Sequence, residues 1–184
     1  RGWSLRPHQA ALIETARRGQ GGLVIAPTGG GKTLAGFLPS LIDLAAHPPR
    51  IHPALHTVYI SPLKALATDV ARNLASPVEE MQLGISLETR TGDTSASRRQ
   101  RQRAKPPDIL LTTPEQLALL VASEHAKRFF ADLKAVIVDE VHAVGLALPL
   151  EIGRRLTIAT AVVHMHVHIA APPARARQVH HPVH

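Results

Sequence analysis

Residues 26–33, which read APTGGGKT, have the composition of a phosphate-binding loop. They follow an apolar run and precede a helical pattern, and this context supports the interpretation. Glycines allow a tight turn that points amide hydrogens at phosphate oxygens, and the start of the next helix adds partial positive charge. The Lys32 ammonium can reach the β- and γ-phosphates, and the Thr33 hydroxyl can bind Mg²⁺. The residues expected to hold the phosphates are Thr28, Gly29, Gly30, Gly31, Lys32 and Thr33.

An acidic pair, Asp139 and Glu140, follows another apolar run at 135–138. A carboxylate at the C-terminal end of a parallel strand lies beside a phosphate loop on a neighbouring strand. Asp139 can hold Mg²⁺, usually through water, and Glu140 can orient or deprotonate an attacking water. The sequence therefore predicts a nucleoside triphosphate site in which Lys32 and Glu140 are catalytic and Thr33 and Asp139 bind the metal. Each motif also has an interpretation without a ligand. The glycines of 26–33 could form an ordinary tight turn, and the acidic pair could be a solvated strand end.

The elements that must position these residues alternate between strands and helices. Short apolar runs have the length of buried parallel strands at 23–26, 57–61, 108–112 and 135–139, and an alternating run lies at 85–89. Helical patterns follow the first three apolar runs, at 33–46, 63–74 and 114–121. This rhythm predicts an α/β fold with a parallel sheet and right-handed crossovers.

The composition limits the class of protein. The chain has 184 residues, 45% of them hydrophobic and 19% charged, which suits one folded domain and excludes a disordered one. It has no cysteine, so a disulfide scaffold, a thiolate zinc site and a cysteine nucleophile are excluded. The net charge of +7 favours a polyanionic partner, but aromatic residues at 3% argue against many base-stacking contacts. The uncharged stretch 156–173 is too short and polar for a membrane span, and we expect a cytoplasmic location.

These motifs together resemble the DExH branch of the superfamily 2 helicases, in which alanine is usual where Ala26 stands. Within this superfamily, the chain most resembles the Lhr-type group and, more narrowly, the bacterial ligase-associated DEXH-box DNA helicases. Residues 26–39, 59–74 and 90–117 carry this resemblance. It implies a RecA-like P-loop NTPase domain, with ATP and Mg²⁺ as cofactors. It also implies ATP-dependent 3′ to 5′ translocation on DNA and its unwinding in repair.

Further residues take roles from this resemblance. Residues 3–9 are similar to the adenine-reading Q-type motif, which implies that Arg6 and Gln9 contact ATP; the Gln9 amide can pair with the adenine edge. The DEVH sequence at 139–142 matches motif II, which implies that His142 couples the ATP site to DNA or to a second domain. The segments similar to strand-contacting motifs supply Ser61, Pro62, Lys64, Thr91, Gly92, Asp93, Thr112, Thr113 and Pro114.

Nucleic acid contact also has a physical basis in these residues. Hydroxyl and amide groups at strand ends bind phosphates without reading the base sequence. The run from Arg98 to Lys105 contains five basic residues and no acid, which would make binding sensitive to salt. A solvated helix face is the alternative for this run. We expect DNA as the partner, as a single strand or a 3′-tailed duplex, with RNA as the alternative, and a DNA-repair ligase or nuclease as an implied protein partner.

The pattern changes after residue 144. Residues 145–184 keep a single acid, Glu151, and are rich in His, Ala and Pro. We therefore assign the helicase ATP-binding domain to 1–144 and interpret 145–184 as an atypical tail. Our hypothesis is that this tail is a frameshifted or otherwise aberrant end. A disordered tail is the second interpretation. In a third reading, His164, His166 and His168 would share one face of a strand and bind Zn²⁺ or Ni²⁺. We find no Ser-Ala-Thr motif III and no second RecA-like domain, so the fold is expected to be incomplete at its C-terminal end.

Three functions remain open on the sequence. The first is the amino-terminal ATPase half of a DNA helicase, weak or inactive alone, because turnover needs an arginine finger from a second domain. The second is a non-catalytic nucleic-acid-binding module. The third is another P-loop NTPase, such as a small kinase, which would need a lid and an acceptor site.

Overall fold

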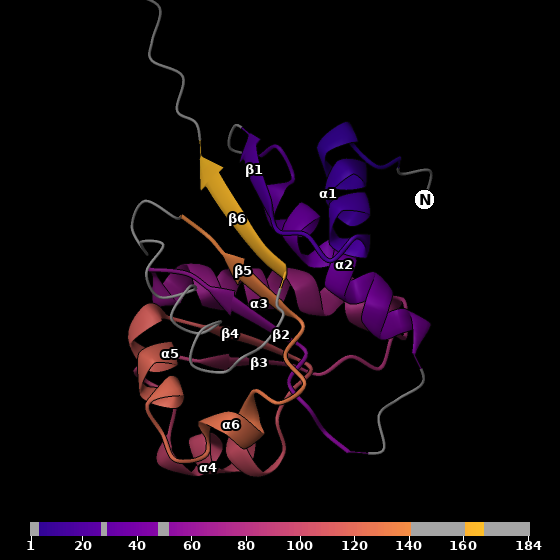
Figure 1. The fold of residues 1–184 in the computed structure, drawn as a ribbon. Coiled ribbons are helices and arrows are strands. Elements are labelled where there is room, and N and C mark those ends of the chain that lie inside the picture. The colour runs from indigo at the N-terminus through magenta and orange to yellow at the C-terminus, as the bar shows by residue number, and fades with distance from the viewer. Residues whose placement is uncertain (1–3, 27–28, 48–51, 141–160, 168–184) are drawn as a thin grey trace, which may run out of the picture.

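The computed structural model describes residues 4–26, 29–47, 52–140 and 161–167. A six-stranded sheet with the order β1-β6-β5-β2-β4-β3 forms the centre, and every neighbouring pair is parallel (Figure 1). The first half of the chain contributes α1 (Pro7–Arg17), β1 (Gly22–Ala26), α2 (Lys32–Ala46), β2 (Thr57–Ile60), α3 (Lys64–Glu80) and β3 (Leu87–Arg90). The second half contributes α4 (Ala96–Ala104), β4 (Ile109–Thr112), α5 (Pro114–Val121), α6 (Ala126–Phe129), β5 (Ala135–Val138) and β6 (Ala161–Val167).

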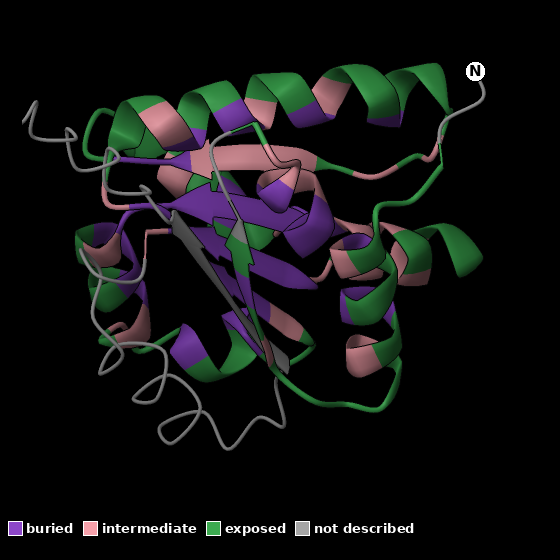
Figure 2. Cartoon of the chain, turned by 90° about the horizontal axis from the view of Figure 1, so that it is seen from above, coloured by how far each residue is buried: buried purple, intermediate pink, exposed green. Residues whose placement is uncertain are grey.

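The sheet has a hydrophobic core on each face. Side chains alternate along a strand, so Tyr59 and Ile137 point to the face covered by α1, α2 and α3, where Phe37 also lies. Leu110 and Val136 point to the other face, which α5 and α6 cover. Figure 2 shows the central strands buried between the two helical layers. Burial on both faces explains why these strands read as continuous apolar runs rather than as alternating ones.

The structure confirms the predicted α/β fold with its parallel sheet. The predicted strands are present as β1, β2, β3, β4 and β5, and the predicted helices as α2, α3 and α5. Helix α3 runs to Glu80, beyond its predicted end at residue 74, because its buried residues Val70, Leu74 and Val78 continue the helical spacing. Proline at position 77 does not end it. Helices α1 and α6 were not predicted, and α4 was expected only in the alternative interpretation of the basic run as a solvated helix face.

Two sequence interpretations are corrected by strand β6. Residues 161–167 fall in the segment that we interpreted as an atypical tail, yet they pair in parallel with both β1 and β5. The acidic pair after β5 is therefore not on the strand next to the phosphate loop, because β6 lies between them (Figure 1). His164 and His166 lie on this strand, whereas His168 is outside the described residues. The frameshift hypothesis for residues 145–184 stays a prediction.

Within residues 4–26, 29–47, 52–140 and 161–167, no helix has the length and apolar character needed to cross a bilayer.

Candidate functional site

Strand β1 and helix α2 hold the glycine-rich turn between them. The strand ends at Ala26 and the helix begins at Lys32, so the turn has the strand-loop-helix context that phosphate binding needs. Gly29 and Gly31 both have a φ of 76°, in the left-handed region that other residues adopt only with strain. Gly31 is the N-cap of α2 and offers no side-chain cap. Because the N-cap of α2 has no side chain, it leaves the first backbone amides of the helix uncapped. An anion that binds at a helix start needs such uncapped amides.

Lys32 and Thr33 open the helix behind this turn. Lys32 has an exposed fraction of only 8%, and Thr33 is partly buried. The effective dielectric constant is lower in a partly buried position than in water, which strengthens the attraction between an ammonium group and a phosphate. The structure therefore places both residues where the sequence analysis expects them, at the N-terminal end of α2. Thr28 lies outside the described residues.

The residues of the Q-type motif lie against the same turn. Gln9, on the first turn of α1, donates through Nε2 to the carbonyl oxygen of Gly31 at 3.4 Å. Its Oε1 accepts from the backbone amide of Arg6 at 3.0 Å. A side chain at position 31 would bring a Cβ to 3.1 Å from Gln9 Nε2 and 4.0 Å from Arg6 Nε. The structure thus brings Arg6 and Gln9 next to the loop. To contact adenine, the Gln9 side-chain amide would have to replace its hydrogen bonds to Gly31 and Arg6 with hydrogen bonds to the base.

Asp139 and Glu140 lie at the C-terminal end of β5. Asp139 is 7% exposed, and its Oδ1 accepts from the backbone amide of Glu140 at 3.0 Å. Its own amide donates to the carbonyl oxygen of Ile60 on β2 at 2.9 Å. Glu140 has a φ of 50°, which is unusual for a residue with a side chain and turns the backbone sharply after the strand. The carboxyl group of Asp139 is thereby held in one orientation at the strand end.

Tyr59 is a site residue that sequence reasoning missed. Its hydroxyl donates to Asp139 Oδ2 at 2.5 Å, and its ring packs on Phe37 of α2 with centroids 5.3 Å apart. Burial, and after it the nearby Asp139 carboxylate, raise the pKa of Tyr59, so the hydroxyl stays protonated as the donor. A buried tyrosine needs a hydrogen-bond partner, and β2 pairs with β5. The single tyrosine of the chain, between Val58 and Ile60 in the predicted strand, was the available signal.

The phosphate loop and the acidic pair share one edge of the sheet. All the strands are parallel, so the turn after β1 and the carboxylates after β5 both lie at the C-terminal edge. Two strand spacings, across β6, correspond to about 10 Å. Helix α2 begins at Lys32, shortly after β1 ends at Ala26, so its N-terminal end lies at the same edge. A triphosphate with a bound divalent cation has the size to join the Lys32 side to the Asp139 side.

The segments proposed for nucleic acid lie along the same edge. Residues 61–64 and 91–93 follow β2 and β3, and residues 112–114 begin at the last residue of β4; the three strands are neighbours in the sheet. Lys64 Nζ donates to Asp93 Oδ2 at 2.7 Å, and this exposed ion pair joins the first two segments. The three segments therefore form one continuous row beyond the strand ends.

The hydroxyl groups in this row do not all face solvent. Ser61, Thr91, Thr112 and Thr113 are buried, whereas Lys64, Gly92 and Asp93 are exposed. Thr112 Oγ1 donates to the carbonyl oxygen of Arg90 at 2.8 Å, so it ties β4 to β3. The expectation that the Thr112 hydroxyl binds a phosphate is therefore corrected for this structure, because that hydroxyl is already used between strands.

The basic run forms helix α4, and three of its arginines contact β3 or the turn after it. Arg98 Nε and Arg101 Nη2 donate to the Glu88 carboxylate at 3.1 Å and 3.0 Å, and Arg99 Nη2 donates to the carbonyl oxygen of Gly92 at 2.8 Å. Burial alone would raise the pKa of Glu88, but hydrogen bonds from Gln102 and Arg98 bring it below its ordinary value. Part of the run therefore attaches α4 to the sheet, a role that neither sequence reading included.

Comparison with protein families decides the assignment. The family described as DEAD/DEAH box helicase matches residues 6–168, from α1 to the end of β6. The chain belongs to the DEAD/DEAH box helicase family. The match continues past residue 144, where the sequence resemblance fades, and it includes the strand that was not predicted.

Individual DEAD/DEAH box helicases show the same similarity. The chain is 37% identical over 172 residues to the ATP-dependent helicase Lhr-Core of Methanocaldococcus jannaschii, covering 85% of this chain and 20% of that protein. It is 40% identical over 183 residues to the Lhr helicase/uracil glycosylase of Escherichia coli, covering 82% of this chain and 12% of that protein. The chain thus spans a fifth or less of the length of these relatives. The predicted resemblance to Lhr-type helicases is confirmed.

Solved helicase structures agree with the fold. The structure of Mycobacterium smegmatis helicase Lhr bound to ssDNA and AMP-PNP has a TM-score of 0.78 and 35% identity, covering 90% of this chain and 23% of that one. The DEAD-box helicase Mss116 bound to ssRNA and UDP-BeF, at 18% identity and a TM-score of 0.75, covers 88% of this chain and 35% of that one and shares the fold. The RecA-like architecture is therefore confirmed.

The donor set of this helicase domain fits Mg²⁺. Among the residues that the structure describes, no group of three His, Cys, Asp or Glu side chains could hold a metal by itself. Mg²⁺ is instead commonly bound by one or two protein oxygens together with waters and substrate phosphates. The Asp139 carboxylate, after β5, and the Thr33 hydroxyl, at the start of α2, are hard oxygen donors of this kind. His142 lies outside the described residues.

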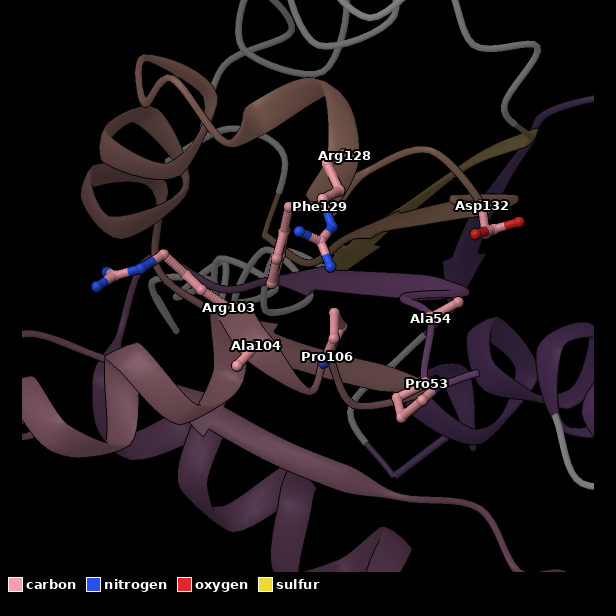
Figure 3. A pocket seen from close by; sticks show the side chains of 8 residues that line it. All are labelled: Pro53, Ala54, Arg103, Ala104, Pro106, Arg128, Phe129 and Asp132. Atoms are coloured by element: carbon pink, nitrogen blue, oxygen red, sulfur yellow. The ribbon is translucent and has the colours of Figure 1, made fainter. Parts of the chain in front are cut away.

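A small cavity lies at the other edge of the sheet in this helicase domain. Its lining includes Pro53, Pro106 and Asp132, which precede β2, β4 and β5 (Figure 3). Its volume is about 60 Å³, whereas sites for small organic ligands typically occupy about 300–1,000 Å³. The cavity is therefore too small for a nucleotide and is separate from the candidate site.

Proposed function

We propose that this chain is the ATP- and DNA-binding part of a DExH-type DNA helicase of the Lhr group. In the longer protein it would couple ATP hydrolysis to movement along a DNA strand. The observation that carries the proposal is the shared edge, where the Lys32 turn, the Asp139 carboxylate and the row after β2, β3 and β4 all lie. The similar Mycobacterium smegmatis helicase Lhr, which was solved with ssDNA and AMP-PNP, supports both ligands.

Each ATP-site residue has a role that follows from its position. Lys32 and the amides at the start of α2 bind the β- and γ-phosphates. Thr33 and Asp139 would hold Mg²⁺, which when bound neutralises charge on the phosphates. Glu140, two residues beyond the strand end, orients or deprotonates the attacking water. Gln9, with Arg6 beside it, contacts the adenine because it already lies against the glycine turn.

The row along the strand ends would bind the DNA backbone without reading its sequence. Lys64 provides an exposed cation, and Gly92 and Thr113 provide backbone amides near the edge, whereas Thr91 and Pro114 shape the turns that carry them. His142 would couple this row or a second domain to the ATP site, because it follows Glu140 by two residues.

The finer parts of the proposal concern the biological role. We place the longer protein in the cytoplasm, in DNA repair, beside a ligase or nuclease, on the resemblance to the ligase-associated DEXH-box DNA helicases. Hydrolysis by the chain alone would be weak, because an arginine finger from a second domain typically contributes about 10³- to 10⁵-fold in turnover. The domain boundary at residue 144 is no longer our preferred one, since the family match runs to residue 168.

A comparison of hydrolysis and strand separation tests this function. In the longer protein, ATP hydrolysis should rise on addition of single-stranded DNA, and a 3′-tailed duplex should separate only with hydrolysable ATP. Glu140→Gln should lower hydrolysis by at least about 10²-fold while nucleotide binding persists. DNA binding with no hydrolysis in the longer protein would contradict the proposal and favour the non-catalytic binding module. Phosphate transfer to a small acceptor would favour the kinase reading.

A further inference from the structure

Exposed cations surround the small cavity at the N-terminal edge of the sheet. The lining comes from three chain segments that precede β2, β4 and β5, within residues 53–54, 103–106 and 128–132. Because the strands are parallel, this edge is opposite to the one that holds the glycine turn and the acidic pair. The proposed function gives the residues of this cavity no role.

The cavity combines apolar walls with one cation that faces inward. Phe129 is 4% exposed, and Pro53 and Pro106 have side chains without hydrogen-bonding groups. Figure 3 shows the Arg128 guanidinium turned toward Pro106, beside the ring of Phe129. Apolar neighbours reduce the screening by water, so a guanidinium in this position attracts a carboxylate more strongly than one in open solvent. We call this site the Arg128 cavity.

The acids near the Arg128 cavity do not neutralise Arg128. Asp132 is the acidic residue of the lining, and it lies apart from the Arg128 guanidinium in Figure 3. Asp108, which precedes β4, accepts from the backbone amide of Ser86 at 2.8 Å and from its hydroxyl at 2.6 Å. The guanidinium of Arg128 is therefore available to an anion that another molecule supplies.

Further cations lie around the Arg128 cavity. Arg103 is at its rim, and Figure 3 shows the guanidinium of this residue pointing away from the other lining residues. Lys105 and Lys127 adjoin lining residues in the chain, and both are exposed. Within the part of the chain that the structure describes, none of these three cations, nor Arg128, forms an ion pair. The surface therefore has an excess of positive charge centred on one concave site.

We propose that the Arg128 cavity binds an acidic segment of a protein partner, with one Asp or Glu carboxylate of that segment inserted against the Arg128 guanidinium. A planar guanidinium can donate paired hydrogen bonds to a carboxylate. The volume of about 60 Å³ admits such a group, although it is too small for a nucleotide. Lys105 and Lys127 attract the neighbouring acids of the segment, which speeds association and favours acidic partners. Arginine and aromatic side chains are also enriched at the centres of protein interfaces.

Two other occupants fit the observations less well. The DNA row beyond β2, β3 and β4 lies at the other end of four-residue strands, about 13 Å away, and a DNA backbone here would bring phosphates close to the exposed Asp132. A second copy of the chain carries the same net charge of +7, which opposes association. The inference does not depend on the proposed function, because it uses neither the ATP residues nor the DNA residues.

The test measures the binding of a fluorescein-labelled peptide of alternating Glu and Ser by fluorescence anisotropy, with the corresponding Gln and Ser peptide as the neutral control. The chain should bind the Glu peptide and not the Gln peptide, and Arg128→Glu should weaken this binding by at least about tenfold. Ala104→Leu fills the cavity and leaves the charge unchanged, and it should weaken binding several-fold. Arg72→Glu on α3 changes the net charge as much as Arg128→Glu does, and as the matched control it should change binding by less than about twofold.

Several results would overturn the proposal. One is equal binding of the Glu peptide by the chain and by Arg128→Glu, and another is equal binding of the two peptides by the chain. Unchanged binding by Ala104→Leu would show that only surface charge attracts the peptide and that no carboxylate enters the cavity. Arg128 is exposed, so Arg128→Glu should keep its melting temperature within about 2 °C. Arg128→Gln removes the charge without adding one, and it decides the question if the reversal lowers the melting temperature further.

The same variants distinguish a protein partner from the other occupants. Single-stranded DNA should bind Arg128→Glu as it binds Arg72→Glu, and a loss confined to Arg128→Glu would assign the cavity to nucleic acid instead. Sedimentation velocity should show one monomeric species, whereas a dimer of the unchanged chain that Arg128→Glu dissociates would assign the cavity to a second copy. Mg-ATP binding should be the same in Arg128→Glu and the unchanged chain. Failure of the unchanged chain to bind Mg-ATP would contradict the proposed function and leave this inference intact.

Discussion

The hydroxyl of Tyr59 donates a 2.5 Å hydrogen bond to Oδ2 of Asp139, and so β2 holds the carboxylate that ends β5. The tyrosine ring in turn packs on Phe37 of α2, the helix that begins with Lys32. The two halves of the proposed ATP site are therefore connected through Tyr59 and the ring of Phe37.

The first prediction concerns this connection. Tyr59→Phe removes the donor and keeps the ring, which leaves one buried acceptor of Asp139 without its partner. We expect the free energy of unfolding to fall by about 1–3 kcal/mol and the Mg²⁺ concentration needed for ATP binding to rise. Urea denaturation and nucleotide titration at several Mg²⁺ concentrations measure the two effects.

A double-mutant cycle with Asp139→Asn provides the control. If Tyr59 acts through Asp139, Tyr59→Phe should change Mg²⁺ dependence much less in the Asp139→Asn background. An equal effect in both backgrounds would mean that Tyr59 influences the site by another route.

The second prediction concerns the glycine turn. Gly31→Ala should lower stability by about 1–3 kcal/mol, because its φ is 76° and side chains tolerate that region poorly. It should also weaken ATP binding, since the new Cβ would lie 3.1 Å from Gln9 Nε2. Gly84→Ala is the matched control, with a φ of 65° and no atom within 4 Å of the added Cβ. It should lose stability without losing ATP affinity; equal affinity losses would contradict the role of Gly31.

The third prediction concerns acid stability. Asp43 on α2 lies 2.7 Å from His56 Nε2 and 3.2 Å from Lys134 Nζ. Burial alone would raise the pKa of Asp43, but the hydrogen bonds and charges of these two partners bring it below its ordinary value. Since the folded-state pKa lies below the unfolded one, the stabilisation is complete above about pH 4 and is lost as the pH falls through the folded-state value.

Asp43→Asn tests this dependence. The variant should be less stable than the unchanged chain at pH 6, and the difference should shrink as the pH is lowered below about 4. Urea denaturation across this pH range measures it. Asp69→Asn, which breaks an exposed ion pair with Arg72 on α3, is the control and should change stability by less than about 1 kcal/mol at every pH. A constant Asp43→Asn difference across the range would refute the assigned cause.

The sequence predicts most of the sheet because β2, β4 and β5 are buried on both faces and therefore read as short apolar runs. Strand β6, with the sequence AVVHMHV, was expected only in the metal-binding reading of the histidines, because it lies in a segment of unusual composition. Its place between β1 and β5 could not be predicted, because this pairing joins residues far apart in the chain and no local pattern contains that information.

The site was predicted to a similar degree. The spacing of the glycine turn and the acidic pair is a local property, so Lys32 and Asp139 could be read directly. The partners of the α4 arginines could not be predicted from the sequence. Whether Arg98 and Arg101 contact solvent, a phosphate or Glu88 depends on how α4 packs against β3.

Lys32 and Asp139 are central to this account, in which they bind one nucleotide and its cation across β6. Titration of a fluorescent ATP analogue, with and without Mg²⁺, into the chain, Lys32→Ala and Asp139→Asn tests it most directly. The account predicts tight Mg²⁺-dependent binding to the unchanged chain, loss of binding in Lys32→Ala, and loss of the Mg²⁺ dependence in Asp139→Asn. Equal binding by all three proteins, with the same response to Mg²⁺, would contradict it.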